Sequence, residues 1–500
     1  MTTIRVTESI CPECLNVLPA TLFVEDDKVY MKKTCPDHGE FKDLVWGDYS
    51  EYKRTMSFYR VGARLENPRT QVKEGCPYDC GICPDHKSQT ILAIIDVTNR
   101  CNLRCPICFA HAGAAGYLYE PTKEEIRGIL ENLMTNKPVI PPAVQYSGGE
   151  PTVREDLAEL VRMADDMGFM HVEINSNGIR MAQSPEYCRE LKRAGTSTVY
   201  LQFDGVTPEP YIYARGFNLL PLKIRAIENL HKAGFNSIVL VPVLIKGVNN
   251  GQVGDILRFA MEHHHTVRAV NFQPVAFTGR ISKGEREKMR ITIPDLMRLM
   301  EEQTKGLIKC ADWFPVPAAN PFSRFVGHLK DIKFVDFSAH PQCGMATYLI
   351  VEKGEIKPIT HYIEINQFIE SLENGNRMIE NGHKTRAKIE TAAKALQNID
   401  LGLFRKHVLP VLKDGDYKSL SDLHHNMIMV GAMHFMDPYN FDLERASRCV
   451  IHYAVPDGRI IPFCTMNTIH RQEIERQFAR PIDTSRITPL VDIKAISGDM

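Results

Sequence analysis

The middle of this 500-residue sequence alternates strand-like and helix-like runs, and this alternation restricts the fold more than any other feature. Apolar runs typical of strands cover residues 91–98, 144–147, 171–175, 198–203, 237–245 and 267–273. A helical pattern follows each run, and after the first one Thr122 and Glu125 form a capping box. Six strand–helix units in series predict parallel strands with right-handed crossovers, as an open doubly wound sheet or a partial barrel. In both folds the active site lies at the carboxyl ends of the strands.

Charge and hydropathy restrict the kinds of binding partner and the cellular compartment that we expect for this protein. The 60 lysines and arginines nearly balance 61 aspartates and glutamates, so no nucleic-acid partner is expected. No signal-peptide pattern opens the sequence, and its apolar runs are shorter than the about 20 residues that span a bilayer. We therefore expect a cytoplasmic protein, with at most a peripheral contact to the membrane.

The chain has 14 cysteines, and most of them lie in tight groups. In a reducing compartment such groups bind metal more often than they form disulfides. The central group, Cys101, Cys105 and Cys108, follows the first predicted strand with the spacing Cys-x3-Cys-x2-Cys. Three thiolates on one loop can hold three corners of an iron–sulfur cube and leave the fourth iron open to a ligand. The alternative is a zinc loop that lacks its fourth ligand.

Polar residues and glycines follow the next three predicted strands. After the second strand, Gly148 and Gly149 let the backbone approach a ligand closely, and Glu150 beside them offers a carboxylate to a cationic amine. Together these groups form one rim opposite the three-cysteine loop, as a small zwitterionic ligand requires. The rim consists of Gly148, Gly149, Glu150, Pro151, Asn177, Gln202 and Asp204.

The three-cysteine loop, the Gly-Gly-Glu-Pro turn and the six-unit pattern together resemble the radical SAM enzymes over residues 91–305. This resemblance implies an α/β fold whose core is a partial (β/α)6 barrel. It also implies that Cys101, Cys105 and Cys108 hold a 4Fe–4S cluster whose open iron binds S-adenosylmethionine. An electron donor such as a ferredoxin or flavodoxin would reduce the cluster, and the resulting 5'-deoxyadenosyl radical would abstract a hydrogen atom from the substrate.

The same resemblance assigns the rim to the cofactor. Residues 148–151 would contact the amino end of S-adenosylmethionine, and Asn177, Gln202 and Asp204 would make further contacts. One position departs from the family pattern, because Ile107 stands where an aromatic residue is usual. This departure weakens the stacking expected beside the adenine and leaves the cluster assignment unchanged.

A second group, Cys76, Cys80 and Cys83, repeats the Cys-x3-Cys-x2-Cys spacing shortly before Cys101. Its expected use is a second 4Fe–4S cluster beside the first one. The alternative is a zinc site that takes its fourth ligand from a distant part of the chain.

A third group lies near the N-terminus, where two short knuckles flank a predicted hairpin. Cys11, Cys14, Cys35 and His38 have the spacing of a ribbon-type site, tetrahedral around zinc or a mononuclear iron. A closed site of this kind favours a structural role over electron transfer.

The remaining cysteines are scattered. Cys343 and Cys449 each lead into a predicted hairpin with a glycine in its turn, and the second hairpin ends at Cys464. These hairpins resemble the auxiliary-cluster hairpins of many radical SAM enzymes, which implies a third 4Fe–4S cluster with Cys310 as a candidate fourth ligand. The alternative is buried thiols without a metal, which is our interpretation of Cys188.

These observations divide the chain into four parts. They predict a charged helix near residues 376–397, and a methionine-rich run at 427–436 that packs in the core or lines an apolar substrate pocket. The predicted parts are a ribbon-like metal-binding domain at 1–60, an auxiliary iron–sulfur segment at 61–90, a radical SAM core at 91–313 and an auxiliary-cluster domain at 314–500.

The order of the cysteine groups, with residues 117–121, resembles the archaeal tetraether synthases, also described as class D radical SAM methylases linked to methanopterin. The resemblance implies that the enzyme joins the terminal carbons of two isoprenoid chains of archaeal diether lipids, with two molecules of S-adenosylmethionine per bond. The rival function is C-methylation of a pterin precursor in methanopterin biosynthesis. A non-enzymatic metal scaffold is disfavoured, because an open iron serves no structural purpose. A long apolar pocket would favour the lipid, and a short polar pocket would favour the pterin.

Overall fold

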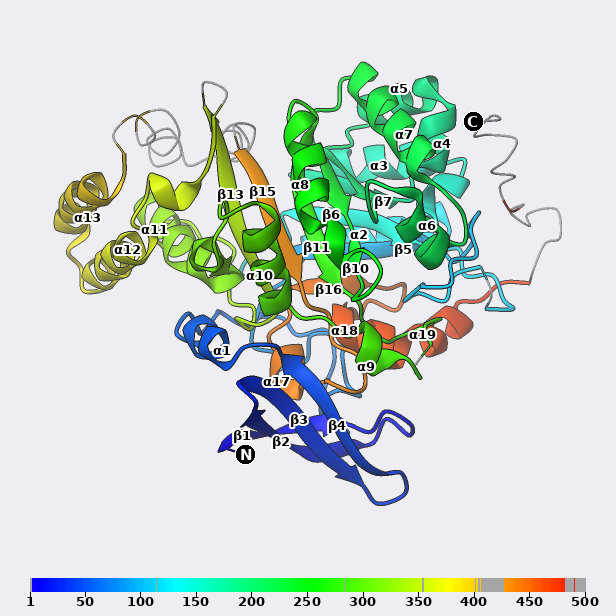
Figure 1. Cartoon of the computed structure of the whole chain (residues 1–500), viewed down its shortest axis with the longest axis horizontal. Helices are drawn as coiled ribbons and strands as arrows, with labels where there is room; N and C mark the ends of the chain where they lie inside the picture. The colour runs from blue at the N-terminus through cyan, green and yellow to red at the C-terminus, as the bar shows by residue number, and fades with distance from the viewer. Residues whose placement is uncertain are drawn as a thin grey trace.

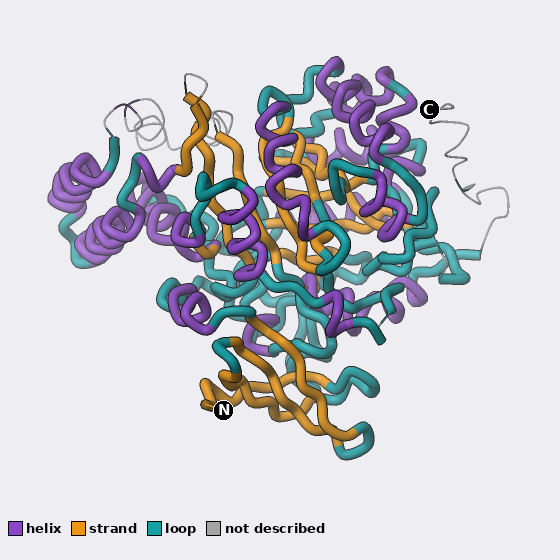
Figure 2. The backbone as a smooth tube through the Cα atoms, viewed as in Figure 1, coloured by secondary structure: helices purple, strands orange, loops and turns teal. Residues whose placement is uncertain are grey.

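A computed structural model describes residues 2–113, 115–282, 284–352, 355–400 and 427–481, together with residues 402, 405 and 490. A small antiparallel sheet from the N-terminus lies at one end of the molecule (Figure 1). Above it stands a large sheet whose strands are covered by helices on their outer side (Figure 2). No helix in these described ranges is long and apolar enough to cross a membrane.

The N-terminal sheet pairs its four strands in sequence order, and a short helix follows it. A two-residue turn joins the second and third strands, with Asp26 and Asp27 both at positive φ, as a tight hairpin requires. This confirms the predicted hairpin. The elements are β1 (Thr2–Ile10), β2 (Val17–Glu25), β3 (Lys28–Cys35), β4 (Gly39–Trp46) and α1 (Tyr49–Met56).

The six predicted core strands are all present, and each pairs in parallel with the next one along the chain. The strands thus follow one another in space in the same order as in the sequence, as in a partial barrel. In a doubly wound sheet the strand order would reverse at a central strand. The predicted fold class is therefore confirmed. The strands are β5 (Leu92–Thr98), β6 (Ala143–Gly148), β7 (His171–Ser176), β8 (Thr198–Gln202), β9 (Ile238–Val241) and β11 (Val267–Pro274).

The helices between these strands bury one apolar face against the sheet. The first of them begins at the predicted capping box, in which Glu125 donates its backbone N–H to Thr122 Oγ1 at 3.1 Å. Its buried stripe includes Ile126, Ile129 and Leu133. The core helices are α2 (Lys123–Met134), α3 (Leu157–Asp166), α4 (Ile179–Gln183), α5 (Pro185–Arg193), α6 (Pro208–Arg215), α7 (Leu220–Lys232), α8 (Val253–Glu262), α9 (Arg286–Met289) and α10 (Ile293–Gln303).

Strands from the C-terminal region extend the core sheet at both edges. β15 (Met427–Met433) pairs in parallel with β11 at one edge, and β16 (Ile451–Ala454) pairs in parallel with β5 at the other. The region expected as an auxiliary-cluster domain thus shares the sheet of the core. Its other strands are β12 (Phe314–Pro315), β13 (Gly344–Glu352), β14 (Glu355–Pro358) and β17 (Ile460–Pro462), while β10 (Val243–Leu244) pairs with β11.

The charged helix predicted near 376–397 is instead two helices, α12 (Ile365–Glu380) and α13 (Lys384–Asn398). The prediction was wrong because Gly382 adopts a positive φ of 86° and ends the first helix with a left-handed residue. The turn of the first late hairpin, at residues 353 and 354, lies outside the described residues. The other α-helices among the described residues are α11 (Asn320–Lys330), α17 (Leu443–Ala446), α18 (Phe463–Thr465) and α19 (Arg471–Gln477).

Candidate active site

The Gly-Gly-Glu turn after β6 lies directly against the end of β5. The backbone N–H groups of Gly149 and Glu150 donate to the carbonyl oxygens of Thr98 and Arg100, at 2.7 and 2.8 Å. A Cβ atom at Gly149 would lie 2.1 Å from the carbonyl oxygen of Arg100, so no side chain fits there. Glycine is therefore required for the turn to reach the backbone that leads into the cysteine loop.

Glu150 is buried and joins this turn to the loop after β7. Its carboxylate accepts hydrogen bonds from Ser176 Oγ at 2.8 Å and from the backbone N–H of Asn177 at 2.7 Å. Desolvation raises the pKa of Glu150, and these hydrogen bonds oppose that rise. Asn177 Nδ2 in turn donates to Asn102 Oδ1 in the cysteine loop at 2.7 Å. Three loops at the carboxyl ends of the strands are thus held together by polar contacts.

These loops surround a cavity of about 390 Å³ inside the curved sheet. Cys101, Cys105 and Cys108 line it, and burial raises the pKa of the first two thiols. A bound iron ion would counter this effect by holding the sulfurs as thiolates, so the donor set fits an iron–sulfur cluster. The predicted rim residues that also line the cavity are Gly148, Gly149, Glu150, Asn177 and Gln202.

Asp204 and Pro151 are not among the residues that line the cavity. Asp204 is fully buried and forms a bidentate ion pair with Arg215 at 2.7 and 2.8 Å. β8 ends at Gln202, so Asp204 lies beyond the strand, while its partner Arg215 lines the cavity. Arg215 also donates to the carbonyl oxygen of Ile107 at 3.0 Å, so the pair fixes the position of the cysteine loop.

Sequence reasoning missed a set of polar side chains deeper in the same cavity. They occupy alternate positions on the core strands, which places them on the inner face of the sheet. A polar residue at every second position of an otherwise apolar strand was the available signal. The set consists of Gln145, Glu173, Asn175, Tyr200, Asn271 and Gln273.

Two of the late cysteines lie near the buried guanidinium of Arg445, and the third lies near both of them. Its Nη2 lies 3.8 Å from Cys343 Sγ, and the charges of Cys343 and Cys464 both raise the pKa of Arg445 against the effect of burial. Burial is the main cause that raises the pKa of the Cys449 thiol, and the nearby charges of Cys464 and Cys343 raise it further. Within the described ranges, Arg445 Nε and Nη1 and both ring nitrogens of His434 are buried without a partner. These groups fit an anionic cluster at this position.

The structure does not bring Cys310 to this late group. Antiparallel pairing of β12 with β13 sets Phe314 opposite Ala346, so the chain before β12 runs away from Cys343. The backbone N–H of Cys310 instead donates to Glu301 Oε2 at 2.9 Å. Cys188 is buried on α5 beside the carbonyl oxygen of Met181, as expected for a thiol without a metal.

Cys76, Cys80 and Cys83 form a separate set close to the late cysteines. Contact with Cys76 raises the pKa of the Cys80 thiol, which also lies near the side chain of Thr465, directly after Cys464. His86 contacts both Cys83 and Cys449. Its backbone N–H donates to the carbonyl oxygen of Cys83, and its ring Nε2 lies 2.9 Å from the carbonyl oxygen of Cys449. In the described residues the fourth ligand of this set is not evident.

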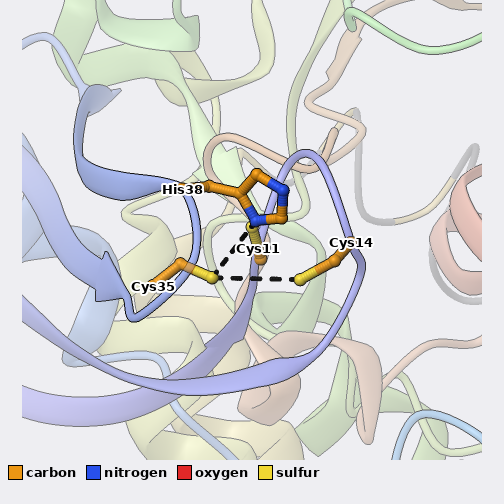
Figure 3. A group of neighbouring side chains, drawn as sticks. All are labelled: Cys11, Cys14, Cys35 and His38. Atoms are coloured by element: carbon orange, nitrogen blue, oxygen red, sulfur yellow. Dashed lines mark hydrogen bonds between the residues drawn. The ribbon is translucent and has the colours of Figure 1, made fainter.

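The N-terminal knuckles bring Cys11, Cys14, Cys35 and His38 together at one end of the small sheet (Figure 3). Cys14 Sγ lies 3.9 Å from Cys35 Sγ, and His38 Nδ1 lies 3.6 Å from Cys11 Sγ and 3.4 Å from Cys35 Sγ. A zinc ion with Zn–S bonds of about 2.3 Å has tetrahedral edges of about 3.8 Å. The four side chains therefore fit a single tetrahedral ion.

Comparison with known proteins defines the class first. The sequence model of the Radical SAM superfamily matches residues 95–260, and that of the HMPTM N-terminal zinc ribbon domain matches residues 3–47. The protein is a radical SAM enzyme with an N-terminal ribbon. It therefore uses a 4Fe–4S cluster and S-adenosylmethionine, needs an electron donor, and has a further metal site in the ribbon.

A close relative then defines the family. The chain is 50% identical over 489 residues to the 7,8-dihydro-6-hydroxymethylpterin dimethyltransferase of Methanocaldococcus jannaschii, covering 95% of this chain and 96% of that protein. The chain belongs to the family of this dimethyltransferase.

More distant relatives match the core. A GTP 3',8-cyclase of Clostridium acetobutylicum is 28% identical over 204 residues, which cover 41% of this chain and 61% of the cyclase. Among solved structures, SuiB of Streptococcus suis is similar with 19% identity and a TM-score of 0.36, over 44% of this chain and 47% of SuiB.

The prediction that the enzyme joins archaeal lipid chains was wrong. A relative with half of its residues identical over nearly the whole chain is a pterin dimethyltransferase, and the ribbon matches a domain of the HMPTM type. The error has a physical reason. Cysteine motifs specify which clusters a chain can hold, whereas the substrate is selected by the lining of the cavity, which those motifs do not describe.

Proposed function

We propose that this protein is a radical SAM methyltransferase that replaces hydrogen atoms on carbon atoms of a reduced pterin with methyl groups. The observation that carries the proposal is the 50% identity, over 95% of the chain, to a 7,8-dihydro-6-hydroxymethylpterin dimethyltransferase. The same dihydropterin is the proposed substrate. The methyl donor would be a one-carbon carrier of the folate type.

The side chains that line the cavity support a substrate with hydrogen-bonding groups. The cavity of about 390 Å³ also contains the cysteine loop and the proposed cofactor site, so its lining and not its volume bears on the substrate. The inner polar set, which includes Glu173 and Asn271, offers hydrogen-bonding groups that a hydrocarbon chain would leave unpaired.

The residues around the cavity have distinct proposed roles. Cys101, Cys105 and Cys108 would hold the cluster, while residues 148–150, with Asn177 and Gln202, would hold S-adenosylmethionine. When bound together, these two groups supply a carbon-centred radical that can remove a hydrogen atom from an unactivated C–H bond. Glu150 would orient the amino end of the cofactor, because its carboxylate is fixed by four hydrogen bonds from three neighbouring residues. Asp204 would act by fixing Arg215.

The other cysteines would hold auxiliary groups. Cys343, Cys449 and Cys464 would bind one further 4Fe–4S cluster, and the set at Cys76, Cys80 and Cys83 would bind another. The ribbon would hold a structural zinc ion, since three thiolates and one imidazole in a closed tetrahedron are typical of zinc. A ferredoxin or flavodoxin would supply the electrons.

The test is anaerobic reconstitution of the full chain with iron and sulfide, followed by incubation with a reductant, S-adenosylmethionine, the dihydropterin and a folate-type carrier charged with a one-carbon unit. Mass spectrometry should find the pterin with one and with two added methyl groups. The Cys105→Ala variant should yield neither 5'-deoxyadenosine nor methylated pterin. Release of 5'-deoxyadenosine by the wild-type enzyme, with no methylated pterin, would contradict the proposal.

A further inference from the structure

The inner polar set forms a connected band on the concave face of the sheet. Gln145 and Glu173 stand directly opposite each other on β6 and β7, and Asn175 stands opposite Tyr200 on β7 and β8. Asn271 on β11 donates a hydrogen bond to the hydroxyl of Tyr200, across the intervening strand. The band therefore crosses most of the width of the curved core sheet.

Glu173 is the acidic member of this band that faces the cavity. Gln145 Nε2 donates to Glu173 Oε2 at 2.7 Å, and His171 Nε2 lies 3.0 Å from Glu173 Oε1. Each carboxylate oxygen has two lone pairs, so each can accept one further hydrogen bond after these contacts. The side chain of Glu173 is only 14% exposed, so its orientation is set by its neighbours. The protein thus presents a fixed pair of acceptors to a ligand in the cavity.

The two ends of the curved sheet supply a different surface to the same cavity. Met429 and Met433 line it from β15, and Tyr453 lines it from β16. Phe435 and Phe463 also line it, stacked with their ring centroids 4.0 Å apart. Thioether and aromatic groups of this kind pack well against the face of a flat heterocycle. Acceptors for an edge and a soft surface for a face therefore occur in one cavity.

The band also lies at a suitable depth. Ser176 contacts Glu150 at the rim, and Glu173 lies three residues before Ser176 on the same extended strand. At about 3.3 Å per residue, this separation is about 10 Å. A bicyclic ligand whose far edge contacts Glu173 would thus reach toward the cysteine loop with its opposite edge.

We propose that Glu173 recognises the 2-amino group and the N3–H group of the pterin, by accepting one hydrogen bond from each on its two oxygens. These neighbouring donors match the spacing of a carboxylate, as a guanidinium fork does. Glu173 is thus a specificity-determining residue, and Gln145 holds it in place. This inference rests on the proposed function, because it assumes that the substrate is a pterin.

The test compares two ligands that differ at the recognised edge. One is 7,8-dihydro-6-hydroxymethylpterin, and the other is its lumazine analogue, in which an oxygen atom replaces the 2-amino group. Binding is measured by calorimetry on anaerobically reconstituted protein with S-adenosylmethionine and without reductant, so that no chemistry occurs. The wild-type protein should bind the pterin at least about tenfold more tightly than the lumazine, because the lumazine oxygen would face the carboxylate.

In Glu173→Gln, pterin binding should weaken by about tenfold or more, and the preference over the lumazine should fall to within about threefold. The affinity for S-adenosylmethionine should stay within about twofold of wild type, which shows that the site is folded. The matched control is Glu186→Gln, since this glutamate is 63% exposed on α5. It should retain the wild-type affinities for both ligands.

Other outcomes overturn the inference in distinguishable ways. If Glu173→Gln keeps the affinity and the preference of wild type, the pterin edge is recognised elsewhere, and methylation by wild type still supports the proposed function. If the variant loses S-adenosylmethionine binding together with pterin binding, Glu173 has a structural role. If wild type binds no pterin, the proposed function falls together with the inference.

Discussion

At the scale of single residues, the approach of the Gly-Gly-Glu turn to the end of β5 depends on glycine. In Gly149→Ala the new Cβ would lie 2.1 Å from the backbone oxygen of Arg100, and a backbone atom cannot rotate away. We expect a loss of about 1–3 kcal/mol in the free energy of unfolding, as for other overpacked sites, and a severe loss of S-adenosylmethionine cleavage. Denaturant melts and the yield of 5'-deoxyadenosine measure the two effects.

The matched control for this variant is Gly128→Ala. Gly128 lies on the exposed side of α2, and a Cβ atom added there would have no neighbour within 4 Å among the described residues. Alanine should stabilise the helix there by up to about 1 kcal/mol and leave cleavage unchanged. Wild-type cleavage by Gly149→Ala would show that the turn can move away from β5.

A second residue-scale prediction concerns Lys223, which is buried and donates to Gln202 Oε1 at 2.7 Å and to the carbonyl oxygen of Asn177. Desolvation lowers its pKa from 10.5 to about 7. The unfolded chain therefore binds more protons than the folded protein between pH 7 and 10.5, so this group makes stability rise with pH in that window.

The Lys223→Met variant removes this titration. We expect the stability difference, wild type minus variant, to increase as the pH rises from about 7 to about 9. Thermal unfolding of both proteins across this range measures it, and the comparison cancels groups that titrate in both. A difference that stays constant or falls with pH would show that Lys223 keeps its proton in the folded protein.

The motifs identified Cys101 and Glu150 because the chemistry of a cluster and an amine leaves a local pattern in the sequence. They did not separate Gln202, which faces the cavity, from Asp204, which does not line it, because that difference depends on where β8 ends. Glu173 was missed for a related reason. A single acidic residue in a strand has no meaning until the curvature of the sheet shows which face is concave.

At the scale of elements, polar contacts join the N-terminal ribbon to the rest of the protein. Lys33 on β3 donates to the carbonyl oxygen of Pro438 at 2.6 Å, and Arg5 on β1 pairs with Asp442. Buried Arg290 contacts Asp43 on β4 at 3.1 Å and Asp437 at 2.6 Å. The sheet of the ribbon is thus fastened to the segment at 434–450, which connects β15 with β16.

This arrangement predicts that the ribbon metal stabilises that connecting segment. Cys14→Ser should lower the zinc content by about one ion per chain, because a structural site needs all four ligands. Hydrogen exchange should then become faster in β1–β4 and at 434–450, since the metal and the fold of such ribbons are coupled. The control Asp37→Ala changes an exposed residue between two ligands and should retain the metal. Iron instead of zinc in the wild-type ribbon would correct the assigned ion.

The core elements could be predicted because each strand–helix unit has a local pattern of an apolar run, a helix cap and a terminal glycine. The capping box of α2 is one example. β15 and β16 could not be placed, because they join the sheet beside β11 and β5, far away in the sequence. A local pattern carries no information about such a distant partner, and pairing depends on the edges that the core leaves open.

At the scale of the whole molecule, the C-terminal region both widens the sheet and carries the late cysteines proposed to bind a cluster. Each late cysteine lies next to one of the added strands: Cys343 before β13, Cys449 before β16 and Cys464 after β17. β16, which lines the cavity with Ile451 and Tyr453, therefore helps to position the proposed auxiliary cluster together with β13 and β17. This arrangement separates two functions of the chain, because the core loop can hold its own cluster without the late cysteines.

The last prediction follows from that separation. The double variant Cys343→Ala, Cys449→Ala should contain about four fewer iron atoms per chain than wild type after reconstitution, because one 4Fe–4S cluster is lost. It should still bind S-adenosylmethionine, since Cys101, Cys105 and Cys108 are unchanged. Cys310→Ala is the matched control and should keep all of its iron, because both the backbone N–H and the thiol of Cys310 contact Glu301, and the chain there runs away from Cys343. Iron analysis and the electron paramagnetic resonance of the reduced proteins measure both effects. An unchanged iron content in the double variant would show that the late cysteines hold no cluster, whereas iron loss in Cys310→Ala would show that the C-terminal strands pair differently around it.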